Sequence, residues 1–254
     1  MKYLFPDNLF SLFFAFSFSE EEKKLISFLP SAQITAALGK ETNAIGLIPT
    51  LDLLTHEELF ISKLGGVSFE SEFCNSYFYY PSKGNQEKVT EIALTGDVSS
   101  LEAILCKILF AELYGQQVKI SLKANQVDET ETPLLLVGDA NLKNGKLFTG
   151  ISFADEAIEI LSAPFVNFIF AGKEKETVEA FNSKFKLLLP KFYESILPFI
   201  SSLNFATEVK YKIKQEFSSF VFEFDSMDID GISQLTRLPY YHGMIKEIID
   251  IKFV

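Results

Sequence analysis

Two segments place polar side chains where a predicted strand ends and a helix is expected to begin. Ser99 and Ser100 lie in the segment 95–102 (TGDVSSLE), directly after a predicted strand. Hydroxyls and free N–H groups at a helix start attract anions, so this segment is either a carboxylate or phosphate seat or an ordinary helix cap. Asp139 ends the predicted strand 134–137. It could orient a hydroxyl, abstract a proton if burial raises its pKa, or cap the next helix.

Other polar and apolar candidates have equally ordinary alternatives. Thr50 ends a strand in a Pro-Thr turn, where it is either a ligand contact or a plain helix cap. Asn8 follows Pro-Asp and most simply caps the phenylalanine-rich segment after it. Pro164 and Phe165 open a hydrophobic strand, for which a place in the core is the simplest interpretation.

Metal and thiol chemistry have little support in this sequence. The chain has two histidines, His56 and His242, and two cysteines, Cys74 and Cys106. These are too few for a tetrahedral zinc site, and no Ser/His/Asp arrangement can be assembled from them. The cysteines lie outside any C-x-x-C spacing, so we expect reduced, buried thiols, with a disulfide between them as the alternative. The sequence implies no metal and no cofactor.

The charge balance narrows the range of partners. The 254 residues include 23 Lys and Arg against 34 Asp and Glu, a net charge of −11, and Arg237 is the single arginine. A nucleic-acid-binding face needs clustered Lys and Arg, so nucleic acid is not expected as a partner. A carboxylate ligand would have to be held by hydroxyls, backbone N–H groups and helix N-termini.

The N-terminal segment differs from a secretory leader in its details. Its apolar run 9–18 is preceded by Pro6, Asp7 and Asn8, three glutamates follow the run, and there is no small-x-small cleavage site. No run approaches the ~20 apolar residues of a membrane span. We therefore expect a cytoplasmic protein without a membrane span, as a monomer or a homodimer.

Short apolar runs alternate with segments of helical period, which is typical of βαβ units with parallel sheets. The predicted helices are 31–38, a long helix from 99 or 100, 174–190, and 232–251. The predicted strands are 2–5, 44–48, 59–61, 76–80, 91–94, 118–121, 134–137, 166–170 and 220–224. Polar stretches at 81–89 and 172–176 are interpreted as crossovers. The sequence thus predicts two α/β lobes, 1–82 with 173–254 and 83–172, and a ligand cleft between them.

The order of these segments matches a known family. The sequence resembles the menaquinone biosynthesis proteins of the futalosine pathway, chorismate dehydratase and its sibling 1,4-dihydroxy-6-naphthoate synthase. The resemblance rests on the colinear segments 29–31 (LPS), 43–50 (NAIGLIPT), 75–80 (NSYFYY), 97–100 (DVSS), 136–140 (LVGDA), 163–166 (APFV), 222–225 (FEFD) and 241–243 (YHG). There are two departures. Segment 6–12 keeps only Asn8 and Leu12 of the family's N-terminal motif, and Asp97 replaces a serine.

The resemblance implies a two-lobed fold of the periplasmic-binding-protein-like II type and a ligand that is a small carboxylate-bearing substrate. The implied activity is that of chorismate dehydratase, which eliminates water from chorismate to give 3-[(1-carboxyvinyl)oxy]benzoate without a cofactor. Asn8 and Ser76 would be catalytic. The residues implied in substrate binding are Thr50, Ser99, Ser100, Asp139, Pro164 and Phe165.

The departures keep other functions open. A carboxylate at Asp97, beside an expected anion seat, would repel a dicarboxylate such as chorismate. The alternatives are a non-catalytic solute-binding protein for a small anionic metabolite and the sibling naphthoate synthase.

Overall fold

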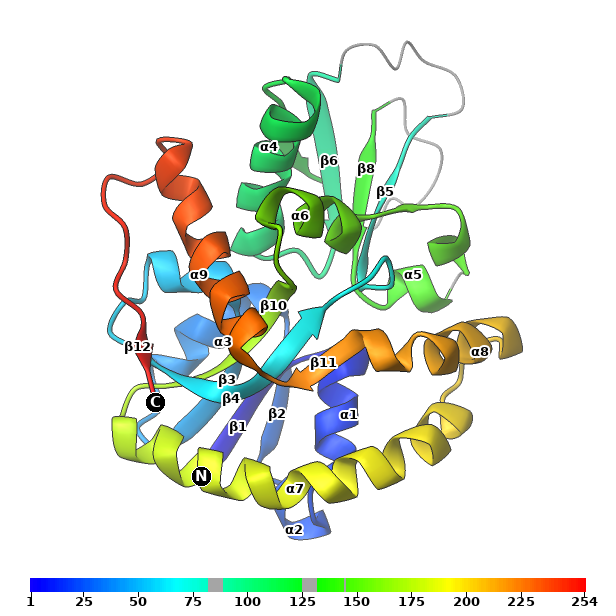
Figure 1. The fold of residues 1–254 in the computed structure, drawn as a ribbon. Coiled ribbons are helices and arrows are strands. Elements are labelled where there is room, and N and C mark those ends of the chain that lie inside the picture. The colour runs from blue at the N-terminus through cyan, green and yellow to red at the C-terminus, as the bar shows by residue number, and fades with distance from the viewer. Residues whose placement is uncertain (82–88, 125–131, 144) are drawn as a thin grey trace.

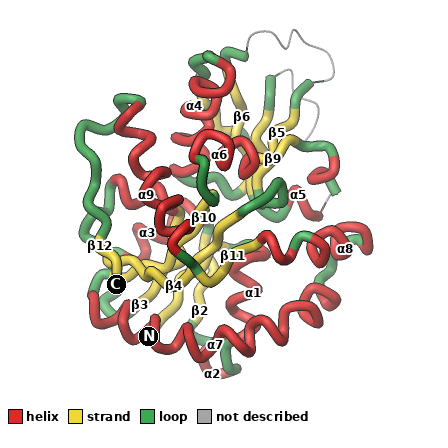
Figure 2. The backbone as a smooth tube through the Cα atoms, in the orientation of Figure 1, coloured by secondary structure: helices red, strands yellow, loops and turns green. Residues whose placement is uncertain are grey.

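A computed structural model describes residues 1–81, 89–124, 132–143 and 145–254 and has two α/β lobes, each built on its own sheet (Figure 1). The chain begins and ends in the first lobe, because β1 and β12 belong to the same sheet (Figure 2). Among the described residues, no helix combines the length and the apolar character needed to cross a bilayer.

The first sheet has the strand order β11-β4-β10-β3-β1-β2, with β12 added beside β4. β1 runs parallel to both neighbours, whereas β10 is antiparallel to β3 and to β4. The strands are β1 (Lys2–Pro6), β2 (Ile26–Leu29), β3 (Ala44–Pro49), β4 (Phe60–Phe69), β10 (Phe165–Gly172), β11 (Phe220–Glu223) and β12 (Lys252–Phe253).

The second sheet has the order β7-β6-β8-β5-β9. β6 is parallel to β7 and β8, and β5 is antiparallel to β8 and β9. The strands are β5 (Ser76–Tyr79), β6 (Glu91–Gly96), β7 (Lys119–Leu122), β8 (Leu134–Val137) and β9 (Ile151–Ser152). The expected parallel units are therefore present in both sheets, but the strands next to the lobe crossings run antiparallel.

The crossings between the sheets differ from the predicted boundaries at 82/83 and 172/173. β5 already belongs to the second sheet and β10 to the first, so the chain changes lobe within 70–75 and again within 162–164. Most of the polar stretch 81–89 lies outside the described residues. The charged stretch 172–176 opens α7 within the first lobe. The true crossings are short and partly buried, so polarity did not reveal them.

The helices cover both sheets. They are α1 (Leu9–Ser17), α2 (Glu20–Lys23), α3 (Ser31–Leu38), α4 (Ser100–Tyr114), α5 (Ala140–Lys143), α6 (Phe153–Leu161), α7 (Lys175–Ser202), α8 (Thr207–Gln215) and α9 (Ser226–Tyr241), with 3₁₀ turns η1 (Thr50–Leu54), η2 (Lys146–Phe148) and η3 (Phe217–Ser219). The predicted closing helix 232–251 was wrong in its bounds, since α9 starts earlier and ends at Tyr241.

Helix α7 continues through Pro190, where the predicted helix ended, and through a second proline, Pro198. Pro190 and Pro198 both lie on its exposed face, while Phe185, Phe192 and Ile196 lie on its buried face. A proline removes one helical N–H, and on the exposed face water can bond the carbonyl that this N–H leaves free. Burial of the apolar face therefore keeps the helix continuous along the first lobe.

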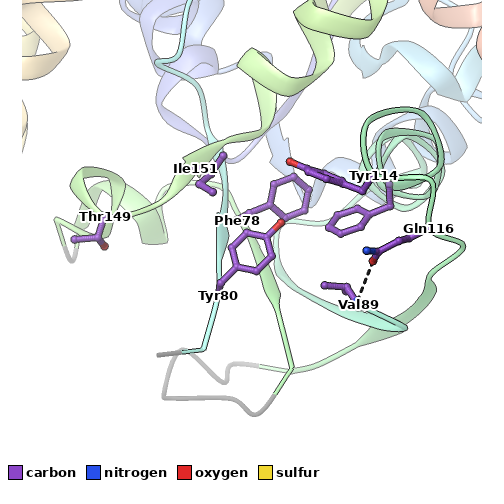
Figure 3. Close-up of a pocket in the computed structure, with 8 residues that line it drawn as sticks. Phe78, Tyr80, Val89, Tyr114, Gln116, Thr149 and Ile151 are labelled. Carbon is purple, nitrogen blue, oxygen red and sulfur yellow. Dashed lines mark hydrogen bonds between the residues drawn. The ribbon is translucent and has the colours of Figure 1, made fainter. Parts of the chain in front are cut away.

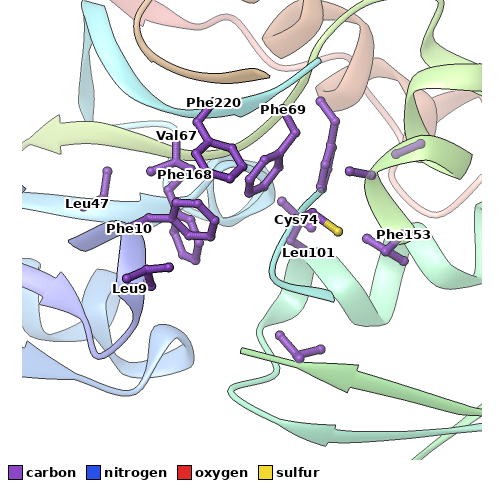
Figure 4. Close-up of a cluster of buried hydrophobic side chains, with 14 of the residues drawn as sticks. Leu9, Phe10, Leu47, Val67, Phe69, Cys74, Leu101, Phe153, Phe168 and Phe220 are labelled. Carbon is purple, nitrogen blue, oxygen red and sulfur yellow. The ribbon is translucent and has the colours of Figure 1, made fainter. Parts of the chain in front are cut away.

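Phenylalanine rings fill the core, as the composition suggested. One hydrophobic cluster extends through both lobes, and Figure 4 shows Phe69 and Phe168 on one side and Leu101 and Phe153 on the other. Phe165 links the two sides, because its ring centroid lies 6.1 Å from that of Phe69 and 5.8 Å from that of Phe153. The contact with Phe153 is edge-on and that with Phe69 is tilted, so Phe165 joins the apolar cores of the two lobes.

Candidate functional site

The start of α1 holds a carboxylate from the opposite lobe. Asn8 is the N-cap of α1, is 2% exposed, and its Oδ1 accepts a hydrogen bond from the Ser11 N–H at 3.0 Å. The Leu9 N–H donates to Oδ1 of Asp139 at 3.0 Å, and Asp139 directly follows β8. Free N–H groups at a helix start favour a negative charge. The sequence argument placed Asn8 and Asp139 separately, and the structure brings them together.

The start of α3 holds a second carboxylate in the same way. Asp97 follows β6 in the second lobe, and its Oδ1 accepts from the Ser31 N–H at 2.8 Å. Its Oδ2 accepts from the Ser31 hydroxyl at 2.5 Å. The backbone reaches this position through Gly96, whose φ is +93° and where an added Cβ would lie 2.0 Å from the Val137 carbonyl oxygen. Only glycine fits such a position, so Gly96 fixes where Asp97 enters the interface.

The start of α4 is occupied by its own side chain. Ser99 is the N-cap, and its hydroxyl and N–H donate to Oε2 of Glu102 at 2.6 and 2.8 Å. Burial raises the pKa of Glu102. Ser100 contacts the first lobe, where its hydroxyl donates to Oδ1 of Asp52 at 2.5 Å. The Thr35 hydroxyl donates to the other oxygen of Asp52 at 2.5 Å.

Ser76 and Thr50 are tied to neighbouring groups. The Ser76 hydroxyl donates to Oδ1 of Asn75 at 3.2 Å, and Nδ2 of Asn167 donates to the same oxygen at 3.1 Å. The Thr50 hydroxyl donates to the Val166 carbonyl at 2.7 Å. Ser76, Thr50 and Asn167 are all almost fully buried. In this closed arrangement their polar atoms link strands to one another.

The two apolar candidates lie in the core rather than among the polar groups. Pro164 is buried at the second lobe crossing, and its carbonyl oxygen lies close to α9, where Gly231 leaves room for it. Phe165 is fully buried between rings of both lobes. Both residues position the lobes, which agrees with their interpretation as core.

Two buried polar atoms in this region have no hydrogen-bond partner within the described chain. They are Nδ2 of Asn8, a donor, and Oδ1 of Asn167, an acceptor. Buried polar groups are nearly always paired, so atoms of this kind mark places where a ligand or water would be bound. Asn8 follows β1 and Asn167 lies in β10, and both strands belong to the sheet of the first lobe.

Asp139 has the titration behaviour expected of a proton acceptor. Burial raises its pKa from 3.8 to about 6, and the charges of Asp7 and Asp97 act in the same direction. The hydrogen bond from the Leu9 N–H and the charge of Lys143 oppose this shift. A carboxyl group of this kind is largely ionised at neutral pH and can exchange a proton near it.

We call the contact region of Asn8, Ser31, Asp97, Ser100 and Asp139 the interlobe site. Within residues 1–81, 89–124, 132–143 and 145–254, no cluster of three or more His, Cys, Asp or Glu has an arrangement suited to a metal ion. A cavity of 190 Å³ lies beside α8, but its lining, which includes Tyr77, Ser152 and Lys212, contains none of the candidate residues.

Sequence reasoning missed three members of this region for a physical reason. Asn141 donates through Nδ2 to the carbonyls of Asn75, Leu136 and Gly138 at 2.9–3.1 Å, and Asn167 bonds Asn75. Their partners come from distant segments or from backbone atoms, so no local spacing reveals them. Asp52 belongs to the segment after Thr50, but only the folded chain brings it to Ser100.

Comparison with known protein families and with curated proteins gave no match at the level of sequence. Solved structures do match. The alkanesulfonate-binding protein SsuA from Xanthomonas axonopodis pv. citri, bound to MOPS, has a TM-score of 0.68 at 13% identity, over 100% of this chain and 97% of that chain. Protein AF1704 from Archaeoglobus fulgidus has a TM-score of 0.62 at 12% identity, over 96% and 98%. The periplasmic aliphatic sulphonate-binding protein SsuA from Escherichia coli gives 0.54 at 12%, over 99% and 95%.

These likenesses define the class of the fold. The chain has the two-lobed α/β architecture of periplasmic solute-binding proteins, which confirms the predicted fold class. At identities of 12–13% the likeness extends to the fold alone. In α/β folds of this type, ligands bind where strand ends and helix starts of the two lobes meet. The interlobe site lies at that place.

Proposed function

We propose that the protein binds a small carboxylate-bearing metabolite at the interlobe site. One observation carries this proposal: donors at the starts of α1 and α3 in the first lobe form hydrogen bonds to carboxylates of the second lobe, Asp139 and Asp97 respectively. The α1 start therefore offers an N–H donor to a carboxylate, and the α3 start offers both an N–H and a hydroxyl donor. When the lobes open, these donors become available, and a substrate carboxylate can replace the protein's own.

The proposed reaction is that of chorismate dehydratase. Its support is the colinear series of family-like segments, together with a titratable carboxyl and an unpaired amide donor at one interface. In this reaction a ring C–H bond breaks and its electron pair forms a ring double bond. The adjacent C–O bond breaks, and the departing hydroxyl leaves as water. The ring becomes aromatic, so the protein need only orient the groups and move one proton.

The residues of the interlobe site divide these tasks. Asp139 accepts the ring proton, for which its raised pKa suits it, and passes this proton to the departing hydroxyl, which leaves as water. Nδ2 of Asn8, which lacks a partner in the ligand-free protein, donates to the departing hydroxyl. The Ser31 donors, and the hydroxyl of Ser100, hold the carboxylates of the substrate. Ser76 supports this arrangement through Asn75 and Asn167.

The test is incubation of the purified protein with chorismate, followed by mass-spectrometric detection of 3-[(1-carboxyvinyl)oxy]benzoate. We expect product from the native protein, and a loss of about 10²- to 10⁴-fold in kcat for Asp139→Asn. Asp155→Asn, which changes an exposed aspartate of the same lobe, serves as the matched control and should keep full activity. If the folded protein binds chorismate but forms no product, the proposed reaction is wrong and the proposed binding site still holds.

A second candidate is a non-catalytic solute-binding protein for a small anionic metabolite. One observation favours it: hydroxyls that would serve catalysis are engaged internally, those of Ser76 with Asn75 and of Ser99 with Glu102. The solved structures of similar fold include two sulphonate-binding proteins. Calorimetry with chorismate and with alkanesulfonates separates the candidates, because this function requires saturable binding without turnover. Absence of binding by any of these anions would reject both.

A further inference from the structure

The second lobe contains a cavity of 430 Å³ at the end opposite the interlobe site. Phe110 and Tyr114 line it from the last turns of α4, whose first residue, Ser100, contacts the first lobe. Phe78 and Tyr80 line it from β5 and from the residue after that strand. This volume falls in the range of small-molecule sites. We call it the second-lobe cavity.

Four aromatic side chains, Phe78, Tyr80, Phe110 and Tyr114, form much of its wall. Figure 3 labels Phe78, Tyr80 and Tyr114 among the lining side chains. The ring centroids of Phe78 and Phe110 are 5.7 Å apart with the planes at 78°. Those of Phe110 and Tyr114 are 5.1 Å apart, and those of Phe78 and Tyr80 are 6.5 Å apart. Aromatic faces carry negative electrostatic potential, so a cluster of rings attracts positive charge as well as apolar groups.

A carboxylate without a cationic partner lies beside these rings. Oε2 of Glu156 accepts a hydrogen bond from the Tyr114 hydroxyl at 2.7 Å. Burial raises the pKa of Glu156, and the charges of Glu159 and Asp155 add to this effect. The charge of Glu156 in turn helps burial to raise the pKa of Tyr80 to about 12. In the described parts of the chain, no Lys, Arg or His forms an ion pair with Glu156.

We propose that the second-lobe cavity binds an organic cation with a compact apolar head, of the quaternary or tertiary ammonium class. The apolar head would lie among Phe78, Tyr80, Phe110 and Tyr114, and the positive charge would face Glu156. Such a ligand supplies the missing counterion and needs no hydrogen bond from the rings. This site is separate from the interlobe site, and its ligand has the opposite charge to the proposed substrate.

The experiment is isothermal titration calorimetry of the full chain with choline and with 3,3-dimethylbutan-1-ol. The two probes have nearly the same shape, but the alcohol lacks the positive charge. We expect saturable choline binding that is roughly tenfold tighter than binding of the alcohol. Glu156→Gln should weaken choline binding about fivefold and leave the alcohol unchanged. Glu159→Gln, an exposed carboxylate on the same helix, is the matched control and should stay within about twofold of the native value.

Two further variants make the outcome decisive. Tyr114→Phe keeps the ring and removes the hydroxyl bonded to Glu156, so choline binding should persist; Tyr114→Leu removes the ring and should weaken it by at least about fivefold. Equal binding of choline and the alcohol, choline binding that survives Glu156→Gln unchanged, or no saturable binding to the folded native chain would each overturn the proposal. Because chorismate is absent, failure here leaves the interlobe proposal standing.

Discussion

Partly buried carboxylates lie at the interlobe site and beside the second-lobe cavity, but their partners differ. At the interlobe site, Asp97 and Asp139 accept hydrogen bonds from helix N-termini of the opposite lobe. Beside the second-lobe cavity, Glu156 accepts one from the hydroxyl of Tyr114, which lines that cavity. Asp97 and Asp139 are thus bonded by N–H groups of the other lobe, whereas Glu156, in the first turn of α6, is bonded by a phenol of its own lobe.

This difference determines what each region requires of a ligand. At the interlobe site a ligand must displace Asp97 or Asp139 and must supply negative charge of its own. In the second-lobe cavity a ligand fills existing space and supplies positive charge. A carboxylate therefore bonds the two lobes to each other in one place and, in the proposed site, faces a cation in the other.

The largest expected effect tests whether the interlobe region is structurally fixed. Asn141→Leu removes the amide that bonds three backbone carbonyls around Gly138, next to Asp139. Because these carbonyls lose a buried donor, we expect a loss of about 3 kcal/mol in the free energy of unfolding. Ile151→Ala, at the half-open edge of the second-lobe cavity, should cost less than about 1 kcal/mol. Urea unfolding of both variants measures the two losses in unfolding free energy. Equal losses would contradict the expected difference between the two regions.

An effect of intermediate size on the free energy of unfolding tests whether Asp97 takes up the hydrogen-bond donors at the start of α3. Asp97→Ala removes two hydrogen bonds to Ser31, so we expect a loss of about 1–2 kcal/mol in unfolding free energy. The same change frees the Ser31 donors and removes a negative charge that repels chorismate, so chorismate should bind about tenfold more tightly. Chemical unfolding and calorimetry measure the two effects. Weaker chorismate binding by this variant would show that Asp97 itself holds the ligand.

The smallest effect concerns the pH dependence of stability. The pKa of Asp139 is about 6 in the folded chain, above its ordinary value of 3.8, so the folded state binds this proton more strongly than the unfolded state. Stability from this group is therefore full below pH ~4 and is lost as the pH rises through ~6. Asp139→Asn should match the native protein in unfolding free energy at pH 4 and exceed it at pH 8, where the native carboxyl is ionised. A constant difference between these two pH values would contradict the raised pKa.

Much of the framework follows from the sequence. The buried runs at 44–48 and 134–137 were recognisable because they are apolar throughout, and they form β3 and β8. The edge strand β2 was missed, since its residues are only partly buried and follow a charged segment. The strand predicted at 59–61 was too short, since β4 runs from Phe60 to Phe69, and Gly65 and Gly66 within it leave room for Phe185 and the Phe168 carbonyl.

The candidate site was predictable only in part. Helix caps at Asn8 and Ser99 follow from local chemistry, and the structure has both. The pairing of Asp97 with Ser31 and of Asp139 with Leu9 did not follow, because each joins residues from different lobes. Local patterns specify which groups end a strand or start a helix, while the partner across the interface depends on how the whole chain packs.

The most direct test of the central claim is a crystal structure of the protein grown with chorismate. The account predicts a ligand at the interlobe site, with a carboxylate on the Ser31 donors and the Asp97–Ser31 hydrogen bonds broken. An empty interlobe site with those hydrogen bonds intact, at a chorismate concentration that saturates the protein in solution, would contradict it.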